Sequence, residues 1–445
     1  MPRSCNEAHS GMSAEQMAAL IDDAPPGPWP DGWAGWDCVR DAQIIRLERE
    51  ISSIKPYPDG RFNGRGIVSS VSAKPGYSSG KNLAQGYFPG AWVMVRELRR
   101  LGCKLPITFC HCGPLEWDAT LTALVAPLGV NVIDLEDYLG VYPCRILAGW
   151  ESKVYGILCA PYEEVLYLDA DNIPLRDPTF LLDSSQYRYA GSIFWPDVPP
   201  YDRAEWLPEC VWRNIGLGYR DEVDFESGQL LIHKRRCWKE LNLTQYVNSN
   251  SDYFYRFVFG DKSTFHLSWA KLGTNWAIPA RLPGGNQASL IQHDFTGAPL
   301  FQHCTRNKAT LSGYPSPGSL LNADQCATHI EALRQGWNGR MWHNEQSSAA
   351  ELRIVNSLIG RRFTYERVGL DSRTISLLAD HRIGRGLARE EVNWSVYVDS
   401  AGPLLAVSSI DGVLTFLARP DADGIWRGRW VQYERCPVAL VPLPS

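Results

Sequence analysis

Hydrophobic positions through the middle of the chain follow two different spacings. Short apolar runs such as "PITFCH" and "VNVIDL" are typical of buried strands, whereas "AWVMVRELRRLG" repeats apolar residues every three to four positions, which predicts a helix. Strands are expected over 66–72, 106–111, 130–135, 164–171, 189–198 and 225–234, and helices over 91–102, 115–129, 146–162, 236–247 and 260–273. Because strands that alternate with helices favour a mostly parallel sheet covered on both faces, we expect an α/β, Rossmann-like domain over residues 61–337.

The pattern changes on both sides of this domain. Residues 1–60 are rich in Pro, Gly and Trp at "DDAPPGPWPDGWAGWD", which predicts an irregular arm with a short helix near 42–51. Residues 362–445 alternate apolar and polar positions and contain two Asp-Gly pairs, Asp411-Gly412 and Asp423-Gly424. These features predict a small accessory module of antiparallel β-strands with hairpin turns. We expect a linker over 338–361.

Composition and charge are those of an ordinary globular protein. The 445 residues are 44% hydrophobic and 21% charged, with a net charge of −5 and no long basic run. Neither a nucleic-acid groove nor a polybasic membrane patch is therefore indicated. No apolar run is long enough for a transmembrane helix, and the start of the chain lacks the apolar segment of a signal peptide. We expect a cytoplasmic protein whose 12 cysteines are mostly reduced thiols.

Two further features each have two interpretations. Cys110 and Cys112 flank a histidine in "CHC", but no second Cys/His pair has a zinc-finger spacing, so we favour a strand leading into a loop over a metal site. Trp394, Trp426 and Trp430 of the β module could stack on sugar rings or fill the core of the module, and we favour the core.

Two carboxylates follow directly after a predicted strand in "EVLYLDADNIPL". Asp169 and Asp171 flank Ala170, so both side chains point to the same side of an extended segment. Ligands of α/β sheets bind beyond the carboxyl ends of the strands, which is where these residues are expected. A divalent cation would relieve the repulsion between the two charges and could be shared with a diphosphate. The sequence therefore predicts a cation site here, with a simple cap of the turn by Asp171 as the alternative.

Five blocks that follow one another along the chain resemble the metal-dependent GT-A glycosyltransferases. The first four are the helix of "WESKVYGILCAPY", the strand end "EVLYLDAD", "FESGQLLIHK" and "GDKSTF", and the fifth, "HCTRNK", resembles the late His…Lys element of these enzymes. The closest likenesses are to the glycogenin and lipopolysaccharide galactosyltransferase-like group and to the fungal-type α-mannosyltransferase group. The glycogenin-like pattern has a Gly between the late His and Lys and a Pro-Trp after them, and "HCTRNKAT" has neither, which favours the mannosyl group. The blocks do not cover the N-terminal arm or the β module.

The resemblance implies a GT-A fold, a UDP- or GDP-hexose donor and a glycan, glycolipid or protein acceptor. It also implies a bound cation, Mn²⁺ or Mg²⁺, and an imidazole beside carboxylates suits Mn²⁺ better. The implied metal ligands are Asp169, Asp171 and His303. Asp169 could instead contact the sugar or ribose of the donor, and His303 could be a hydrogen-bonded structural residue.

The remaining blocks carry the implied contacts with the donor and the acceptor. The candidates for the donor nucleotide are Ser69, Ser70, Lys153, Asp169 and Lys308, with Arg306 as a further candidate for the phosphates. The candidates for the sugars are Glu226, Ser227, Gly228, Asp261 and Lys262, and those for the reacting centre are Gln229, Glu226 and Lys153. Simpler interpretations stay open: Lys153 as a solvated helical lysine, Lys308 as part of a basic loop, Gln229 pointing away from the site, and Asp261 as a helix N-cap.

Both groups retain anomeric configuration, so the resemblance implies a retaining hexosyltransferase whose leaving phosphate helps to deprotonate the acceptor hydroxyl. No carboxylate in the sequence is identifiable as an inverting base. One alternative is a sugar-1-phosphate nucleotidyltransferase, although "SSVSAKPGYSSG" does not match the Gly- and Arg-containing loop of those enzymes. The other is a catalytically inactive carbohydrate-binding protein.

Overall fold

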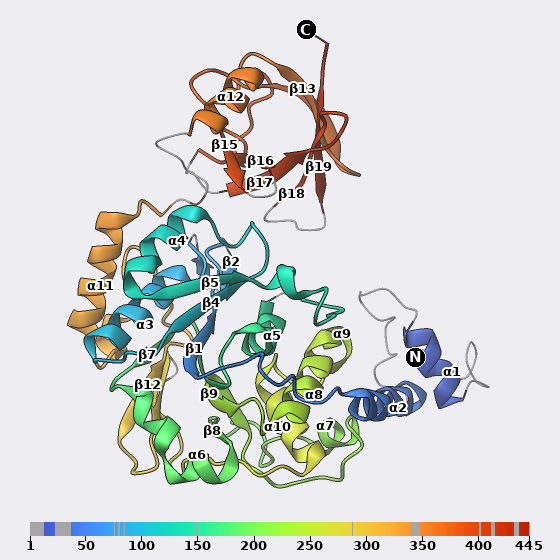
Figure 1. Ribbon diagram of the computed structural model, residues 1–445, viewed down its shortest axis with the longest axis vertical. Coiled ribbons are helices and arrows are strands. Elements are labelled where there is room, and N and C mark those ends of the chain that lie inside the picture. The colour runs from blue at the N-terminus through green and yellow to red at the C-terminus, as the bar shows by residue number, and fades with distance from the viewer. Residues whose placement is uncertain are drawn as a thin grey trace.

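A computed structural model gives the fold of the chain. It describes residues 13–22, 37–74, 76–78, 81–83, 85–147, 149–286, 288–339, 341, 348–399, 402–410, 414–430 and 436–444. Figure 1 shows a large α/β part and a small C-terminal part made mainly of strands. The α/β class with a mostly parallel sheet, predicted from the sequence, is confirmed.

A six-stranded sheet forms the centre of the α/β part, in the order β5-β4-β1-β6-β9-β8. Strands β5, β4, β1 and β6 are parallel, and β9 runs antiparallel to both of its neighbours. The strands are β1 (Arg65–Ser70), β4 (Ile107–His111), β5 (Val130–Asp134), β6 (Glu164–Leu168), β8 (Ser192–Pro196) and β9 (Phe225–His233).

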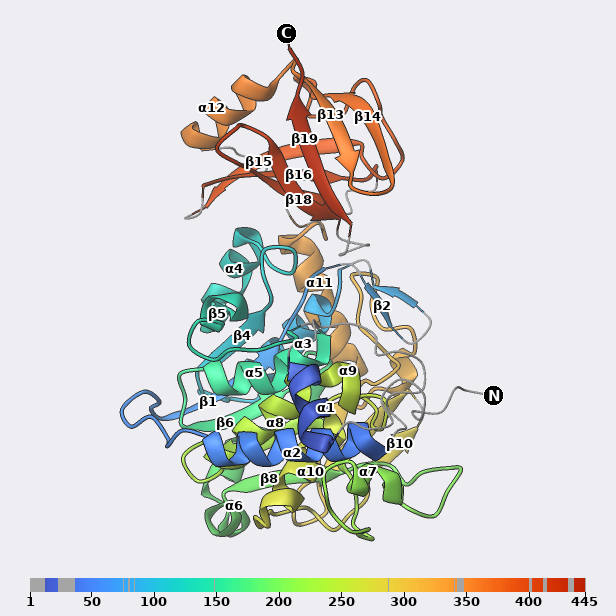
Figure 2. The same ribbon diagram turned by 90° about the vertical axis from the view of Figure 1, so that its right-hand side faces the viewer.

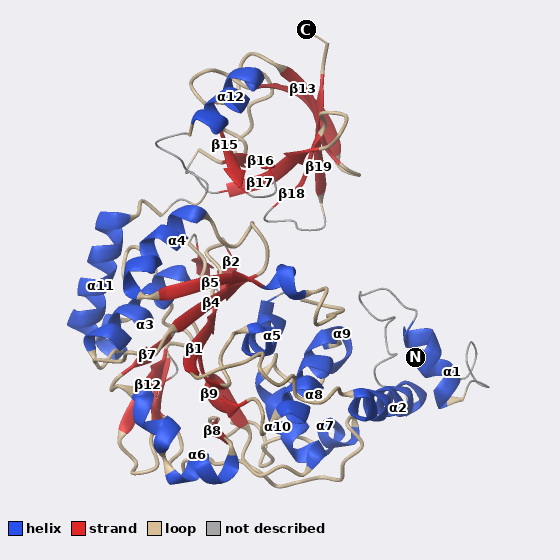
Figure 3. Cartoon of the chain, in the orientation of Figure 1, coloured by secondary structure: helices blue, strands red, loops and turns tan. Residues whose placement is uncertain are grey.

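Helices cover both faces of this sheet (Figure 3). On β1, Ile67 enters the core formed with α3, and its neighbour Val68 enters the core formed with α5, so alternate side chains are buried on opposite faces. This two-sided burial explains why the strands read as nearly continuous apolar runs. The α-helices are α3 (Phe88–Arg100), α4 (Ala119–Val125), α5 (Ser152–Cys159), α6 (Ser185–Ala190), α7 (Glu209–Arg213), α8 (Trp238–Ser249), α9 (Ser251–Phe254), α10 (Lys262–Leu272) and α11 (Ala323–Gly336). The 3₁₀ turns are η2 (Ala126–Leu128), η3 (Leu135–Tyr138), η4 (Gly149–Glu151), η5 (Pro178–Asp183) and η6 (Pro317–Ser319).

Two helices are shorter than the sequence pattern predicts. The helix expected over 115–129 begins only at Ala119, because the side chain of Asp118 caps it by accepting a hydrogen bond from Leu121 N at 2.9 Å. The helix expected over 146–162 is the turn η4 followed by α5, which ends before Pro161, since proline disfavours helical geometry in the residue that precedes it.

A second, antiparallel sheet that the sequence pattern did not predict lies beside the central one. It has the order β10-β11-β12-β7 and consists of β10 (Gly284–Asn286), β11 (Ser289–His293), β12 (Pro299–His303) and β7 (Asn172–Pro174). β7 begins directly after Asp171, and its Asn172 pairs with His303 at the end of β12. A separate hairpin joins β2 (Gly76–Ser78) and β3 (Lys81–Leu83).

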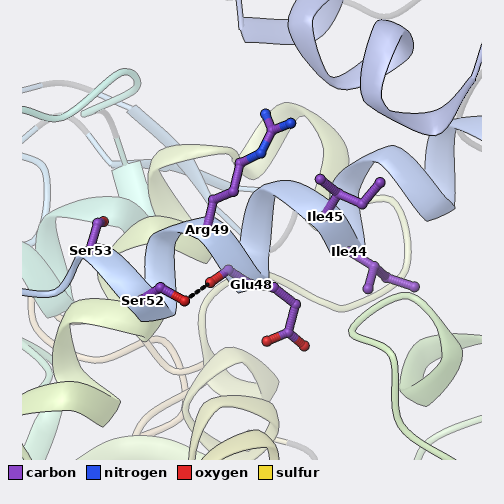
Figure 4. A pocket seen from close by; sticks show the side chains of 6 residues that line it. All are labelled: Ile44, Ile45, Glu48, Arg49, Ser52 and Ser53. Carbon is purple, nitrogen blue, oxygen red and sulfur yellow. Dashed lines mark hydrogen bonds between the residues drawn. The ribbon is translucent and has the colours of Figure 1, made fainter.

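The N-terminal segment contains more helix than expected. Helices α1 (Ala14–Asp22) and α2 (Asp37–Ser53) pack with α8 and α10 through a shared apolar core that includes Leu47 and Leu243. Most of the Pro-rich stretch lies outside the described residues. α2 also borders a surface hollow of about 550 Å³ (Figure 4), lined by Ile44, Ile45, Glu48, Arg49, Ser52 and Ser53.

The C-terminal module is a seven-stranded antiparallel sheet with one helix (Figure 2). Its elements are α12 (Ala349–Leu358), β13 (Arg362–Arg367), β14 (Asp371–Ser376), β15 (Asn393–Asp399), β16 (Gly402–Ser408), β17 (Leu414–Pro420), β18 (Trp426–Trp430) and β19 (Pro437–Pro442). α12 lies inside the segment expected to be a linker, and its Val355 and Leu358 belong to the core of the module.

Most sequence expectations for the module agree with its structure. The side chains of Trp394, Trp426 and Trp430 are in its core, as favoured. Gly424 has a φ of +75° in the turn between β17 and β18, as the second Asp-Gly hairpin requires. Asp411-Gly412 lies outside the described residues, between the paired strands β16 and β17.

Membrane-spanning helices and disulfide bonds were considered along the described residues. Among the described residues, no helix is both long and apolar enough to cross a membrane. The cysteines in the described part of the chain are free thiols.

Candidate active site

Asp169, Asp171 and His303 come together at the carboxyl end of β6. One ligand atom from each lies within 4.8 Å of the others. The backbone fixes the two aspartates, because Asp169 N donates to Gly228 O at 2.8 Å and Asn172 N donates to Asp169 O at 3.0 Å. His303 arrives through the β7–β12 pairing, which brings its Nε2 to 3.2 Å from Asp171 Oδ1 and 3.8 Å from Asp169 Oδ2.

The charges of this cluster are strongly coupled. Burial opposes ionisation of Asp171, but Lys308, which contacts it directly, and His303 hold the pKa of this carboxyl well below its usual range. Burial raises the pKa of Asp169 above its ordinary value, in spite of the nearby Lys153 and His303. Burial also disfavours a charged His303, yet Glu226 and Asp171 raise the pKa of the imidazole to about 10. The carboxylates therefore favour positive charge at this position, which His303 and Lys308 supply in the structure and which a bound cation could supply in part.

Lys153 links the cluster to β9 and α10. The lysine is 4% exposed, so it is not a solvated helical lysine. Its Nζ lies 3.1 Å from Asp169 Oδ2 and 3.0 Å from Asp261 Oδ2, and it donates to Ser227 O and Ser227 Oγ at 2.8 Å each. Burial lowers the pKa of Lys153, but the carboxylates outweigh burial and raise it above the ordinary value. The lysine is thus a buried, charged group.

Asp261 faces Lys153 rather than the helix that follows it. It occupies the N-cap position of α10 but makes no side-chain capping hydrogen bond. Its Oδ2 instead accepts a hydrogen bond from Ser227 Oγ at 3.0 Å, in addition to the contact with Lys153. The interpretation of Asp261 as a helix cap is therefore not what the structure shows.

Glu226 contacts the Nδ1 side of His303, and Gln229 contacts Glu226. Glu226 Oε1 is 2.9 Å from His303 Nδ1 and accepts from Gly228 N at 2.7 Å, and Oε2 accepts from Gln229 Nε2 at 2.5 Å. His303 lowers the pKa of Glu226 to about 2 although burial opposes this. Gln229 is fully buried, and its Oε1 accepts from Asn172 Nδ2 at 2.7 Å. These bonds orient the imidazole, and the predicted sugar contacts of Glu226 and Gln229 stay predictions.

Gly228 is required by the packing of His303. A Cβ atom at this position would lie 2.4 Å from His303 Nδ1, which is closer than real contacts allow. The predicted contact of Gly228 with a sugar stays a prediction. In the structure the group that approaches this backbone is the side chain of His303.

The remaining predicted residues lie around this centre. Lys262 Nζ is 2.7 Å from Asp197 Oδ2 and 2.7 Å from Asp224 Oδ2, so it is held by two carboxylates. The hydroxyl groups of Ser69 and Ser70 are buried at the end of β1 and have no hydrogen-bond partner in the described part of the chain. The predicted contacts of Ser69, Ser70 and Lys308 with the donor stay predictions.

The sequence did not lead us to three polar residues of the site, which are Asn172, Asp197 and Asp224. Asn172 directly follows the Asp-x-Asp pair, so its position was a usable signal. Asp197 lies in the loop after β8 and Asp224 directly precedes β9, and neither stands in a distinctive sequence pattern.

At the "CHC" segment, the sequence favoured a strand leading into a loop over a metal site. Within the described residues, the groups with metal-site geometry include Asp169, Asp171 and His303 but not Cys110, His111 and Cys112. Arg306 is exposed.

Comparisons with known proteins give matches over the middle of the chain. The family model described as "Mannosyltransferase putative" matches residues 64–211 and 217–284. Candida albicans α-1,2-mannosyltransferase MNN24 is 28% identical over 217 residues, covering 40% of this chain and 31% of that protein. MNN21 of the same organism is 26% identical over 294 residues, covering 52% and 42%. The chain thus spans about a third to under a half of the length of these curated relatives.

Two solved structures are also similar, at low identity. Galactosyltransferase LgtC in complex with donor and acceptor sugar analogues matches with a TM-score of 0.33 and 14% identity, covering 61% of this chain and 100% of that one. Mannosyltransferase Ktr4p of Saccharomyces cerevisiae matches with a TM-score of 0.29 and 10% identity, covering 57% and 80%. The resemblance to the α-mannosyltransferases predicted from the sequence is confirmed by the family model and the curated relatives, which support a glycosyltransferase.

Proposed function

We propose, on the premise that residues 64–284 resemble mannosyltransferases, that the chain transfers a hexose from a nucleotide-diphosphate donor to a hydroxyl group of an acceptor. The observation that carries the proposal is the cluster of Asp169, Asp171 and His303 at the carboxyl end of β6. The two aspartates lie within the residues that the family model matches, and His303 follows them in the chain. In α/β sheets this edge is where ligands bind.

The donor set of the cluster fits a divalent cation. Two carboxylates and one imidazole are available, and carboxylate repulsion would be relieved by the ion. An imidazole among the ligands favours Mn²⁺ over Mg²⁺, which prefers oxygen ligands throughout. Such an ion would neutralise the charge that gathers on a departing diphosphate. Glu226 would orient His303 for this role through its bond to Nδ1.

Two buried lysines would stabilise the negative charge of the leaving diphosphate. Lys153 and Lys308 both contact aspartates of the Asp-x-Asp pair, so both lie beside the proposed position of the phosphates. We infer that they attract the donor and stabilise its departing diphosphate. Ser69 and Ser70 would contact the nucleotide through hydroxyl groups that have no partner in the described chain.

We propose retention of anomeric configuration. The other carboxylates described at this site are already engaged, Glu226 by His303, Asp261 by Lys153, and Asp197 and Asp224 by Lys262. None of these four is therefore a free base suited to activating an acceptor from the opposite face of the sugar. Deprotonation of the acceptor by the leaving phosphate needs no such base.

A binding screen tests the proposal directly. GDP-mannose, other GDP- and UDP-hexoses and the free nucleotides would be added with and without Mn²⁺, and the melting temperature would be measured. We expect one donor to raise it only when Mn²⁺ is present, because a ligand that binds the native state stabilises it. The product formed with a sugar acceptor would then be analysed by NMR for its anomeric configuration. No stabilisation by any donor would overturn the proposal, and pyrophosphate release from a nucleoside triphosphate and a sugar phosphate would favour a nucleotidyltransferase.

A further inference from the structure

Two exposed aromatic side chains stand side by side next to the candidate active site. Trp150 is 52% exposed and Phe259 is 78% exposed. Their ring centroids are 5.6 Å apart with an interplanar angle of 45°, and Trp150 is also 6.1 Å from the ring of Tyr255. Single exposed aromatics are common on proteins, but a pair in contact forms a small apolar platform, which is typical of a binding surface.

Each residue of the platform is close in the chain to a residue of the charged centre. Trp150 lies in η4, one turn before Lys153 along the chain. Phe259 is two residues before Asp261, and the 3.0 Å contact between Lys153 and Asp261 closes the connection. The two aromatic residues therefore stand on the two segments that hold the buried lysine.

The turn that leads into α10 is built around the indole ring. Gly260 has a φ of +68°, and a Cβ atom at this position would lie 2.8 Å from Cε3 of Trp150. Both the backbone conformation and the close approach of the ring require glycine here. The ring of Trp150 thus rests on the backbone next to Asp261, while about half of the residue stays exposed.

We propose that Trp150 and Phe259 form the acceptor subsite, on which a pyranose ring of a glycan acceptor stacks through its C–H face. The inference rests on the proposed function, because a sugar held here would present a hydroxyl group toward the donor beside Lys153 and Asp261. Aromatic rings supply a large, rigid apolar surface, and the C–H face of a sugar is the part of an acceptor that such a surface fits. The acceptor is then a glycan, and a protein or lipid surface without a sugar is not expected to bind.

Transfer kinetics with defined sugars test the platform. The donor would be the one identified by the binding screen, with Mn²⁺, and the acceptors would be methyl α-mannoside and α-mannobiose. The variants are Trp150→Ala, Phe259→Ala, the double variant and the conservative Trp150→Phe. Tyr189→Ala is the matched control, because Tyr189 on α6 is also 78% exposed and is not part of the site.

The expected result separates acceptor binding from donor chemistry. Hydrolysis of the donor without acceptor should stay within about twofold of the original protein in Phe259→Ala and Trp150→Phe, since both keep an aromatic ring against the backbone next to Asp261. The KM for α-mannobiose should rise about tenfold in each alanine variant, which corresponds to the loss of one stacking contact. Trp150→Phe should recover most of this loss, and Tyr189→Ala should change nothing.

Two contrary outcomes have different meanings. Intact donor hydrolysis with an unchanged acceptor KM in the double variant would overturn the platform but leave the proposed function standing. Absence of both transfer and donor hydrolysis in the original protein would overturn the proposed function. In that case saturation-transfer NMR with α-mannobiose alone still tests whether the platform binds a sugar. The signal of the bound sugar should be present with the original protein and lost with the double variant. A protein acceptor that is glycosylated equally well by the double variant would also overturn it.

Discussion

Nε2 of His303 lies 3.2 Å from Oδ1 of Asp171, although the two residues are far apart in the chain. The contact exists because β12 pairs with β7, the strand that begins one residue after Asp171. The imidazole is held from its other side by Glu226, so both ring nitrogens face carboxylates. The geometry of the proposed cation site therefore depends on strand pairing as much as on the Asp-x-Asp segment.

Replacing Asp171 by Asn should abolish the stabilisation by Mn²⁺ and donor. The amide keeps the size of the side chain but loses the charge that the ion requires. Loss of a residue that only supports a metal ligand typically lowers activity roughly 10- to 100-fold. Because Asp171 is itself a proposed ligand, the rate of transfer should fall by more than this. The matched control is Asp423→Asn in the β module, which should keep full activity. Unaltered Mn²⁺ dependence of the melting temperature in the Asp171 variant would contradict the assignment.

Gly228→Ala should damage the site without touching a charge. The new methyl group would collide with His303 Nδ1, so the imidazole must leave its present position between Glu226 and Asp171. We expect about 1–3 kcal/mol lower stability from the forced shift and roughly 10- to 100-fold weaker Mn²⁺ binding. Calorimetric titration with Mn²⁺ measures the second effect. Gly218→Ala serves as the control, because a Cβ there meets nothing within 4 Å; equal Mn²⁺ affinity in the two variants would refute the argument.

Lys153→Met should destabilise the protein as well as weaken donor binding. Removing the cation leaves Asp261 buried without its partner, a change that typically costs about 3–5 kcal/mol. Adding Asp261→Asn to Lys153→Met removes the unpaired charge and should restore part of the stability but none of the activity. Urea unfolding of the single and double variants gives the coupling energy. If the two substitutions are strictly additive in stability, the ion pair is not what holds Lys153.

Stability should fall at low pH because of Glu97. This buried carboxylate joins α3 to α11, with Oε2 3.0 Å from His329 Nε2 and Oε1 2.6 Å from Arg100 Nη2. Burial raises the pKa of Glu97, but His329 and Arg100 outweigh it and lower the pKa to about 2. Because the folded pKa is depressed, this carboxylate stabilises the fold above its ordinary pKa of about 4.5, and the contribution is lost as the pH falls toward 2.

The variant Glu97→Gln tests this contribution. It should be less stable than the original protein at pH 7 and show a weaker decline of unfolding free energy between pH 5 and pH 2. Glu331→Gln, on the exposed side of α11, should follow the original curve. Parallel pH profiles for Glu97→Gln and the original protein would show that another group controls acid unfolding.

The sequence determined the parts of this protein that depend on neighbours in the chain. The apolar spacing indicated the strands and most helices of the central sheet, and Asp169 and Asp171 were identified because alternation and a strand end are local properties. The tertiary structure decided what faces these residues. Glu226 contacts His303 and is itself held by Gln229, Asp261 faces Lys153 instead of capping α10, and Gly228 makes room for an imidazole. Pairing of β7 with β12 and packing of α10 on β9 join segments distant in sequence, and such long-range contacts leave no periodic signal in the residues that make them.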